Sequence, residues 1–166
     1  NEEILSSILP DLNAIAVFAI NKDLKLVIDD HFKDIRIQPL MQSVWTHLYR
    51  RSYAGPRRKL YAYFHEKRME VFSFQQNRFR FSNSYEATNE HDALYYLLYI
   101  WKLTGMDVEK DELYLVGDIH YQDWLIDKVK QYLKFCRVIN QEVYFNNSQL
   151  ANRTEIPYDM KAIYLE

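Results

Sequence analysis

The chain has 166 residues, 48% of them apolar, and a formal net charge of −2, so it is long enough for a packed core and lacks an electrostatic bias toward nucleic acid or anionic membranes. Its three glycines stand far apart, which excludes the glycine-rich loops that bind phosphate in dinucleotide-binding and P-loop proteins. A single cysteine excludes an intrachain disulfide and a CxxC metal or redox site, and no apolar run reaches the ~18–20 residues of a membrane-spanning helix. We therefore expect a cytoplasmic protein.

The first thirty residues carry helical and strand patterns in turn. Apolar residues at helical spacing predict a short helix over residues 2–9, and the continuous apolar run Ala14–Ile20 predicts a fully buried strand of a parallel sheet. Asn21 then suits the N-cap of a helix. The residues on the apolar face of that helix are Leu24, Val27, Ile28 and His31.

A strand, a helix and a basic linker follow. Residues 34–38 (DIRIQ) predict a short strand, and residues 39–51 predict a helix with Pro39 in its first turn. The segment Arg50–Lys59 contains the one Gly-Pro pair and five basic residues without an acid, so we place the main break of the chain there.

After this break the apolar pattern changes to a period of two, which predicts strands. Connections of two to three residues between them favour an antiparallel meander. In the third strand we expect Phe79 and Phe81 to share one face and Arg78 and Arg80 the other. The three predicted strands are Lys59–His65, Met69–Gln75 and Arg78–Ser82.

The remainder alternates helix and strand. A helix follows Asn89 or Thr88 as its N-cap and ends at Gly105, where a left-handed residue is favoured. The further predicted elements are a strand at Glu112–Gly117, a helix at Tyr121–Lys134, and strand-like pieces at Phe135–Ile139, Glu142–Phe145 and Lys161–Leu165.

From Lys59 onward this order is β-β-β-α-β-α-β, the order of a ribonuclease-H-like module with right-handed crossovers. The sequence resembles the actin-like ATPase superfamily, which joins two such modules and includes actin, the Hsp70 ATPase domain, sugar kinases and type IV pilus actin-like assembly proteins. In detail it looks like an uncharacterised bacterial family assigned to this superfamily. The resemblance is carried by AVFAINKDLKLVIDDHFKDIRIQPLMQSVWTHLYR, by KLYAYFHEKRMEVFSFQQNRFRFSNSYEATNEHDALYYLLYIWKL and by ELYLVGDIHYQDWLIDKVKQYL.

The resemblance implies an α/β fold of ribonuclease-H-like modules in an actin-like arrangement, with a mixed sheet and helices on both faces. Residues 1–51 would form the C-terminal part of an incomplete first module, residues 52–57 a linker, and residues 58–166 a complete second module. We then expect the exposed sheet edge of the first module to be covered by another protein or by a missing N-terminal segment.

The nucleotide motifs of this superfamily are degenerate here. Relatives carry a DxG-type phosphate-binding turn between the first two strands of each module, where this chain has His65, Glu66 and Lys67. At the adenosine position relatives have a strand ending in Gly-Gly, and this chain has Gly117 and Asp118. These five residues are the candidate cofactor-binding positions. For Asp118 the alternative is a structural role, as the N-cap of the helix that follows.

We expect no bound cofactor, because these motifs are degenerate, and no catalytic residue, because no residue carries a sufficient signal. We expect no metal site, because the five histidines are scattered without chelating spacing. The predicted function is a non-catalytic scaffold or protein-interaction module that has lost nucleotide binding. An actin-like ATPase with weak ATP binding is the alternative. A second alternative is nucleic-acid binding through the basic, aromatic meander. Tyr95 and Tyr99, on a helix that is apolar nearly all round, are candidate partner contacts.

Overall fold

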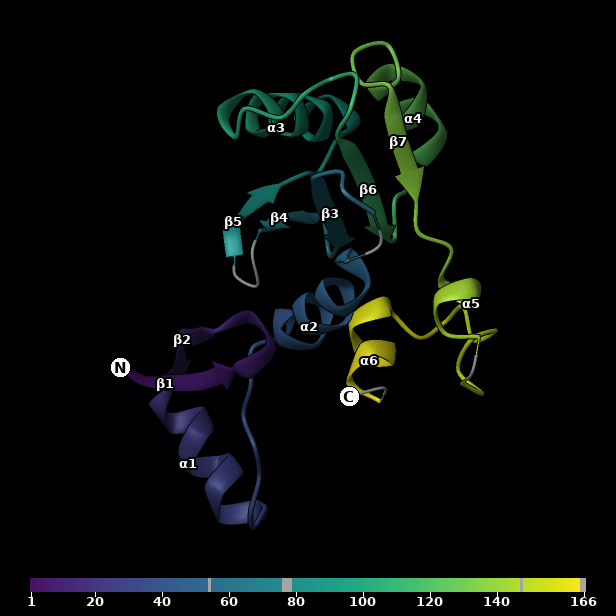
Figure 1. Ribbon diagram of the computed structural model, residues 1–166. Helices are drawn as coiled ribbons and strands as arrows, with labels where there is room; N and C mark the ends of the chain where they lie inside the picture. Colours follow the sequence, from purple (N-terminus) through teal and green to yellow (C-terminus); the bar gives the residue numbers. More distant parts are fainter. Residues whose placement is uncertain (54, 76–78, 147, 165–166) are drawn as a thin grey trace.

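The computed structural model describes residues 1–53, 55–75, 79–146 and 148–164. Its centre is a five-stranded sheet in the order β5-β4-β3-β6-β7, in which β3, β4 and β5 are antiparallel neighbours and β6 and β7 run parallel to β3 (Figure 1). The meander and the ribonuclease-H-like strand order are thus confirmed. The strands are β3 (Lys59–His65), β4 (Arg68–Phe74), β5 (Phe79–Glu86), β6 (Glu112–Gly117) and β7 (Phe135–Val138).

Helices cover both faces of this sheet. On one face α3 (Glu90–Leu103) and α4 (Gln122–Val129) pack against Leu60, Ala62 and Phe64 of β3. On the other face α2 (Met41–Ser52) and α6 (Tyr158–Ile163) pack against Tyr61 and Tyr63 of the same strand. The alternation predicted for this strand therefore places its side chains in two separate cores.

The N-terminal residues differ from the predicted helix. They form β1 (Glu2–Leu9), which turns through the short 3-10 helix η1 (Pro10–Leu12) into β2 (Ala14–Asn21), and the two strands pair antiparallel as a separate hairpin. Ile4 and Ile8 share one face of β1, because the spacing i, i+4 fits a strand face as well as a helix face. Alternate residues of β2 are also exposed, so the prediction of a fully buried parallel strand was wrong.

Helix α1 (Lys22–His31) follows β2 directly, and the Asn21 side-chain oxygen accepts hydrogen bonds from the backbone N–H groups of Asp23 and Leu24 at 2.8 and 3.1 Å. The predicted cap is confirmed. Helix α1 projects away from the main sheet and contains no buried residue (Figure 1). Residues 34–38 form no strand, since they lie beside no strand partner, whereas the helix after Pro39 is present as α2.

The C-terminal tail is helical where strands were predicted. Residues 141–144 form α5 (Gln141–Tyr144), because the Asn140 side chain caps its first turn, and residues 158–163 form α6. Both predicted strands, at 142–145 and 161–165, were therefore wrong, residue 165 itself lying outside the described range. The predicted strand at Phe135 is present as β7, and the helix predicted at 121–134 ends at Val129.

A β-bulge changes the faces of β5. The register shifts between Ser73 and Phe74 of β4, so Phe79 packs with the α2 side of the sheet while Phe81 packs on the α3 side. The prediction that both rings share a face was wrong because the bulge inserts one extra residue. Arg78 lies outside the described residues.

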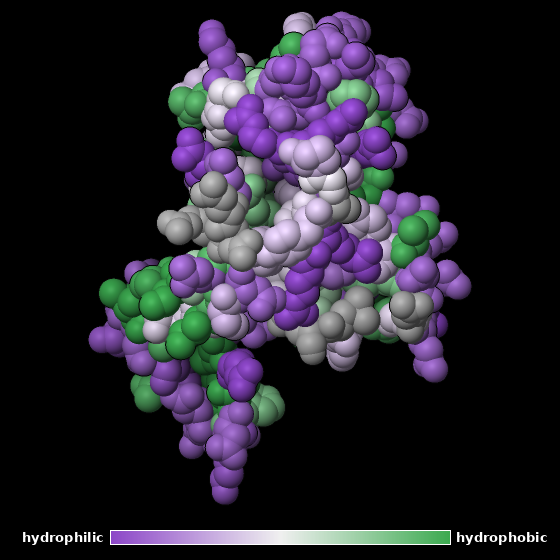
Figure 2. Space-filling view, in the orientation of Figure 1, coloured by the Kyte–Doolittle hydropathy of each residue, from purple (hydrophilic) through white to green (hydrophobic). Residues whose placement is uncertain are grey.

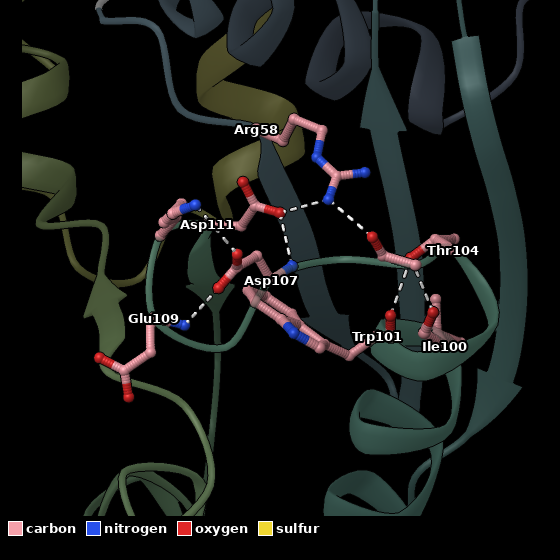
Figure 3. Close-up of polar contacts among 9 residues, drawn as sticks. Arg58, Ile100, Trp101, Thr104, Asp107, Glu109 and Asp111 are labelled. Atoms are coloured by element: carbon pink, nitrogen blue, oxygen red, sulfur yellow. Dashed lines mark hydrogen bonds and ion pairs between the residues drawn. The ribbon is translucent and has the colours of Figure 1, made fainter.

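The loop between α3 and β6 is held by one buried carboxylate (Figure 3). Asp111, almost fully buried, lies 2.6 Å from the Arg58 guanidinium and accepts a hydrogen bond from the Asp107 N–H at 2.7 Å. Arg58 also donates to the Gly105 carbonyl at 2.7 Å. One guanidinium therefore joins the start of β3 to the end of α3 and to the loop before β6.

We expect Arg58→Ala to lower the free energy of unfolding by about 1–2 kcal/mol, because it leaves a buried carboxylate without its cation. Chemical denaturation measures this loss. The matched control is Arg153→Ala, whose partner Glu155 is more than half exposed, and which should cost less than about 0.5 kcal/mol. Equal losses in the two variants would contradict this role for Asp111.

Candidate functional site at the ends of β3 and β6

The carboxyl ends of the parallel strands β3 and β6 lie side by side. Phe64 is paired with Gly117, and the Asp118 N–H donates to the Phe64 carbonyl at 3.2 Å. The turn between β3 and β4 follows at the same edge. Because parallel neighbours end together, this edge collects chain segments more than fifty residues apart in sequence.

A cleft of about 620 Å³ opens at this edge. Four of the five candidate residues line it, and Lys67 lines an adjoining cleft of about 400 Å³ that Asp118 and His120 also border. The structure thus brings the candidate residues together. Their assignment as candidate cofactor-binding positions stays a prediction. The four residues in the larger cleft are His65, Glu66, Gly117 and Asp118.

The opposite wall comes from the segment that leads into α6, which the sequence interpretation missed. Thr154, Glu155, Tyr158 and Asp159 all line the cleft. The signal that could have located them is the proline at 157, a helix-start residue that argues against a strand in this segment.

Asp159 is a buried carboxylate in this wall, with 6% of its surface exposed. It accepts a hydrogen bond from the Met160 N–H at 2.8 Å and contacts the phenol of Tyr63. Burial raises the pKa of Tyr63, and the Asp159 charge raises it further. Both donors to Asp159 are neutral, so no protein cation balances this charge among the described residues.

Gly117 has a φ of +95°, and the space where a Cβ would lie is filled by protein. An ideal Cβ would come within 2.2 Å of the Phe64 carbonyl oxygen and 2.8 Å of the Tyr63 ring. The glycine therefore permits close contact between β6 and β3. The turn residues Glu66 and Lys67 also have positive φ, at 43° and 63°, as in a two-residue type I′ hairpin turn.

The charges around the cleft are mainly acidic. Its described lining residues include four carboxylates and neither lysine nor arginine, while phosphate recognition relies on cations, helix N-termini or glycine-rich backbone. Among the described residues no group of three or more His, Cys, Asp or Glu is arranged to hold a metal ion. The four carboxylates are Glu66, Asp118, Glu155 and Asp159.

His65 lines the cleft and also contacts two side chains of the sheet. Its ring stacks on Tyr63 with centroids 5.1 Å apart, and Nε2 lies 3.4 Å from a Glu70 oxygen. Burial alone would raise the pKa of Glu70, but hydrogen bonds from His65 and Ser84 and the charges of His65 and Arg68 lower it overall. At the surface His120 lies 3.7 Å from Asp118. Asp118 does not cap α4, since Tyr121 occupies the N-cap position.

The aromatic side chains of the meander lie in the core. Tyr61, Tyr63 and Phe72 are each at most 3% exposed, so they offer no face on which bases could stack. Two basic residues of the linker region also have protein partners: Arg50 pairs with Asp11, and Arg51 donates to a carbonyl of α5. These contacts give no support to the alternative of nucleic-acid binding.

The fold and this strand-end cleft place the chain among α/β proteins with the actin-like ATPase fold. The whole chain superposes, with a TM-score of 0.83 and 23% identity, on a solved protein from Bacteroides thetaiotaomicron described as having an actin-like ATPase fold and unknown function. The chain spans 60% of the length of that protein.

The family assignment is more specific than the fold. Residues 1–136 match the family model described as "Protein of unknown function (DUF3822)", and the chain belongs to this family. No curated protein matches the chain. The resemblance seen in the sequence, to an uncharacterised family with the actin-like fold, is thereby confirmed. Within the described residues no helix has the length and apolarity needed to cross a membrane.

Proposed function

We propose that this chain is a nucleotide-independent protein-interaction module of the actin-like fold, and that the hairpin β1–β2 is its contact surface. The observation that carries the proposal is the exposure of one apolar hairpin face, which gathers hydrophobic residues at the lower left of Figure 2. Exposed apolar patches of this kind mark interaction sites. The exposed fractions on this face are 74% for Ile4, 72% for Ile8, 65% for Ile15 and 68% for Val17.

The opposite hairpin face is only half-buried, and it packs on the body through Leu9 and Leu12 beside Tyr49. Strands with apolar residues on both faces are typical of the interior of a covered sheet. An isolated two-stranded hairpin is at best marginally stable in water. The hairpin therefore has the character of part of a larger sheet.

The occupant that we propose is a further polypeptide segment, which adds a β-strand at a free edge of the hairpin and also covers the exposed apolar face. Within the described residues β1 and β2 pair only with each other, so each keeps one edge open. The Bacteroides protein suggests the kind of segment, since 40% of its chain (100% minus 60%) lies beyond the part matched here. Nucleotide independence is supported by the acidic lining of the cleft.

Replacing Ile15 with a photoreactive amino acid tests this surface in cells. Irradiation should cross-link the polypeptide that covers the surface, and the cross-linked product identifies it. That polypeptide, once purified, should slow amide hydrogen exchange in β1 or β2. Val17→Lys should weaken its binding by about tenfold or more, as expected for a central apolar contact. Val108→Lys, at an exposed valine of the body, is the matched control.

Equal affinities for the two lysine variants would refute the hairpin as the contact surface. Nucleotide independence is tested separately by isothermal titration with Mg-ATP and Mg-ADP. Binding with a micromolar Kd would overturn that part of the proposal and favour the weak ATPase.

A further inference from the structure

We propose that the outer strand β5 pairs with β5 of a second copy of the chain, antiparallel and centred on Asn83, so that two five-stranded sheets join into one. This surface is distinct from the hairpin, and the inference does not depend on the function proposed above. Three features carry it: an open strand edge, a sequence that matches itself in one register, and opposite charges without ion-pair partners.

Strand β5 is the long open edge of the main sheet. It has eight residues and, within the described part of the chain, pairs only with β4. In Figure 1 no further strand or helix lies beyond it. The opposite edge strand, β7, has only four residues, and short edge strands resist pairing. In contrast, β5 contains neither proline nor lysine, the residues that commonly block an edge.

The free backbone groups of β5 belong to alternate residues. The Ala87 N–H donates to the Lys67 carbonyl at 2.9 Å, so Ala87 and every second residue before it bond to β4. The residues between them direct their N–H and C=O groups away from β4, because bonded and non-bonded pairs alternate along antiparallel strands. The register with β4 is regular from Phe81 to Glu86, beyond the bulge. The outward residues of this stretch are Ser82, Ser84 and Glu86.

One register matches β5 to its own copy. When Asn83 faces Asn83 of the second copy, the outward residue Ser82 faces the outward residue Ser84, as hydrogen bonding requires. Phe81 then faces Tyr85, and both rings lie on the α3 side of the sheet, packed against the same core. A shift of two residues in either direction separates Phe81 from Tyr85. A two-fold axis through Asn83 therefore repeats every favourable contact.

The same register brings opposite charges together. Arg80 and Glu86 are exposed, and neither has an ion-pair partner among the residues that the structure describes. Arg68 faces Glu86 from β4 but donates to the Ser84 hydroxyl at 2.6 Å instead. With Asn83 at the centre, Arg80 of each copy faces Glu86 of the other. Opposite charges that face each other across antiparallel strands stabilise the pairing, so the charge pattern favours a second copy as the occupant of this edge.

The first test is the oligomeric state of the whole chain. Pairing through one strand buries less than the ~1,200 Å² of a standard interface, so we expect a reversible dimer with a Kd of about 10–100 μM. Sedimentation velocity from about 5 to 500 μM should show a shift from monomer to dimer as the concentration rises. A chain that stays monomeric over this range overturns the proposal.

Charge reversal tests the register. Glu86→Arg sets two arginines opposite each other at both ends of the dimer, and it should weaken dimerisation by about tenfold or more. Arg80→Glu should do the same with two acids, whereas a mixture of the two variants should form a heterodimer, since each supplies the charge that the other needs. Asp127→Arg, at an exposed position of α4, is the matched control and should dimerise like the wild type. The proposal is overturned if Glu86→Arg also dimerises like the wild type, or if the mixture dimerises no better than either variant alone.

A cysteine at the two-fold axis locates the contact. Facing Cα atoms of a non-hydrogen-bonded antiparallel pair are about 4.5 Å apart, within reach of a disulfide. Mild oxidation should therefore cross-link Asn83→Cys into a covalent dimer, and the native thiol of Cys136 is buried and should not compete. Glu86→Cys is the control, because its two copies would lie about 20 Å apart along the paired strands. Equal cross-linking of the two cysteine variants would contradict the pairing centred on Asn83.

Discussion

Gly117→Ala is expected to lower the free energy of unfolding by about 2–5 kcal/mol. An alanine at a φ of +95° costs about 1–2 kcal/mol in backbone strain. Its Cβ would also lie 2.2 Å from the Phe64 carbonyl oxygen, so β3 and β6 must separate locally, at about 1–3 kcal/mol for an overpacked site. Denaturant unfolding gives the magnitude, and amide exchange at Asp118, which donates to that carbonyl, gives the location.

Gly105→Ala is the matched control. Gly105 also has a positive φ, at +62°, but nothing lies within 4 Å of a Cβ added there. Gly105→Ala should therefore lose only the backbone-strain component of the stability, about 1–2 kcal/mol. If both variants lose the same stability, the close contact of Gly117 with β3 is not what requires glycine.

The part of the fold that the sequence predicted well is the part in which local and long-range signals agree. In β3 the period of two separates Tyr61 and Tyr63 from Ala62, and the sheet buries both sets. At α3 the Asn89 side chain accepts from the Asp92 N–H at 2.9 Å, as the capping pattern predicts. The short connections between β3, β4 and β5 then allowed only a few strand orders for the sheet.

The N-terminal hairpin could not be predicted because its pattern is ambiguous. The apolar residues of β1 fit one face of a helix, and they fit the two faces of a strand equally well. They are Ile4, Leu5, Ile8 and Leu9. The deciding interaction is the pairing of Leu5 with Phe18, which lies thirteen residues away. Whether residues 1–51 are the end of a first module stays a prediction.

The candidate cleft was predictable only on one side. His65, Glu66, Gly117 and Asp118 meet because parallel strands end together, which the strand order implies. Asp159 was missed because its segment has no periodic pattern and joins the site through α6, which packs on α2 from more than a hundred residues away. Two of the four carboxylates that line the cleft, Glu155 and Asp159, belong to that missed wall.

The final prediction concerns acid stability through His47, which joins α2 to the C-terminal helices. Arg51 donates to its Nε2 at 3.0 Å, so the ring hydrogen resides on Nδ1, which lies 3.1 Å from the Tyr158 hydroxyl. The ring also stacks on Phe145 at 5.0 Å. Burial, which has the largest effect, and the charges of Arg51 and Arg50 together lower the pKa of His47 from 6.5 to about 4.

Between about pH 6.5 and pH 4, His47 is neutral in the folded chain because its pKa is lowered, whereas the same side chain takes up a proton in the unfolded chain. The stability that neutral His47 contributes is therefore complete above about pH 6.5 and is lost as the pH falls toward 4. At about 1.4 kcal/mol per pH unit the loss is at most about 3 kcal/mol, and partial exposure of the ring brings the expected value to about 2 kcal/mol.

The measurement is the free energy of unfolding of the wild type and of His47→Gln between pH 7 and 4. Glutamine does not titrate, so the difference between the two proteins should shrink by about 2 kcal/mol over this interval. The carboxyls of Glu70 and Asp107, whose pKa values are lowered, destabilise both proteins equally at the acid end and cancel in the difference. His120→Gln, at a side chain that is 79% exposed, should show no such change. A constant difference for His47→Gln would mean that the folded chain accepts the proton, and that the contact with Arg51 rearranges to admit it.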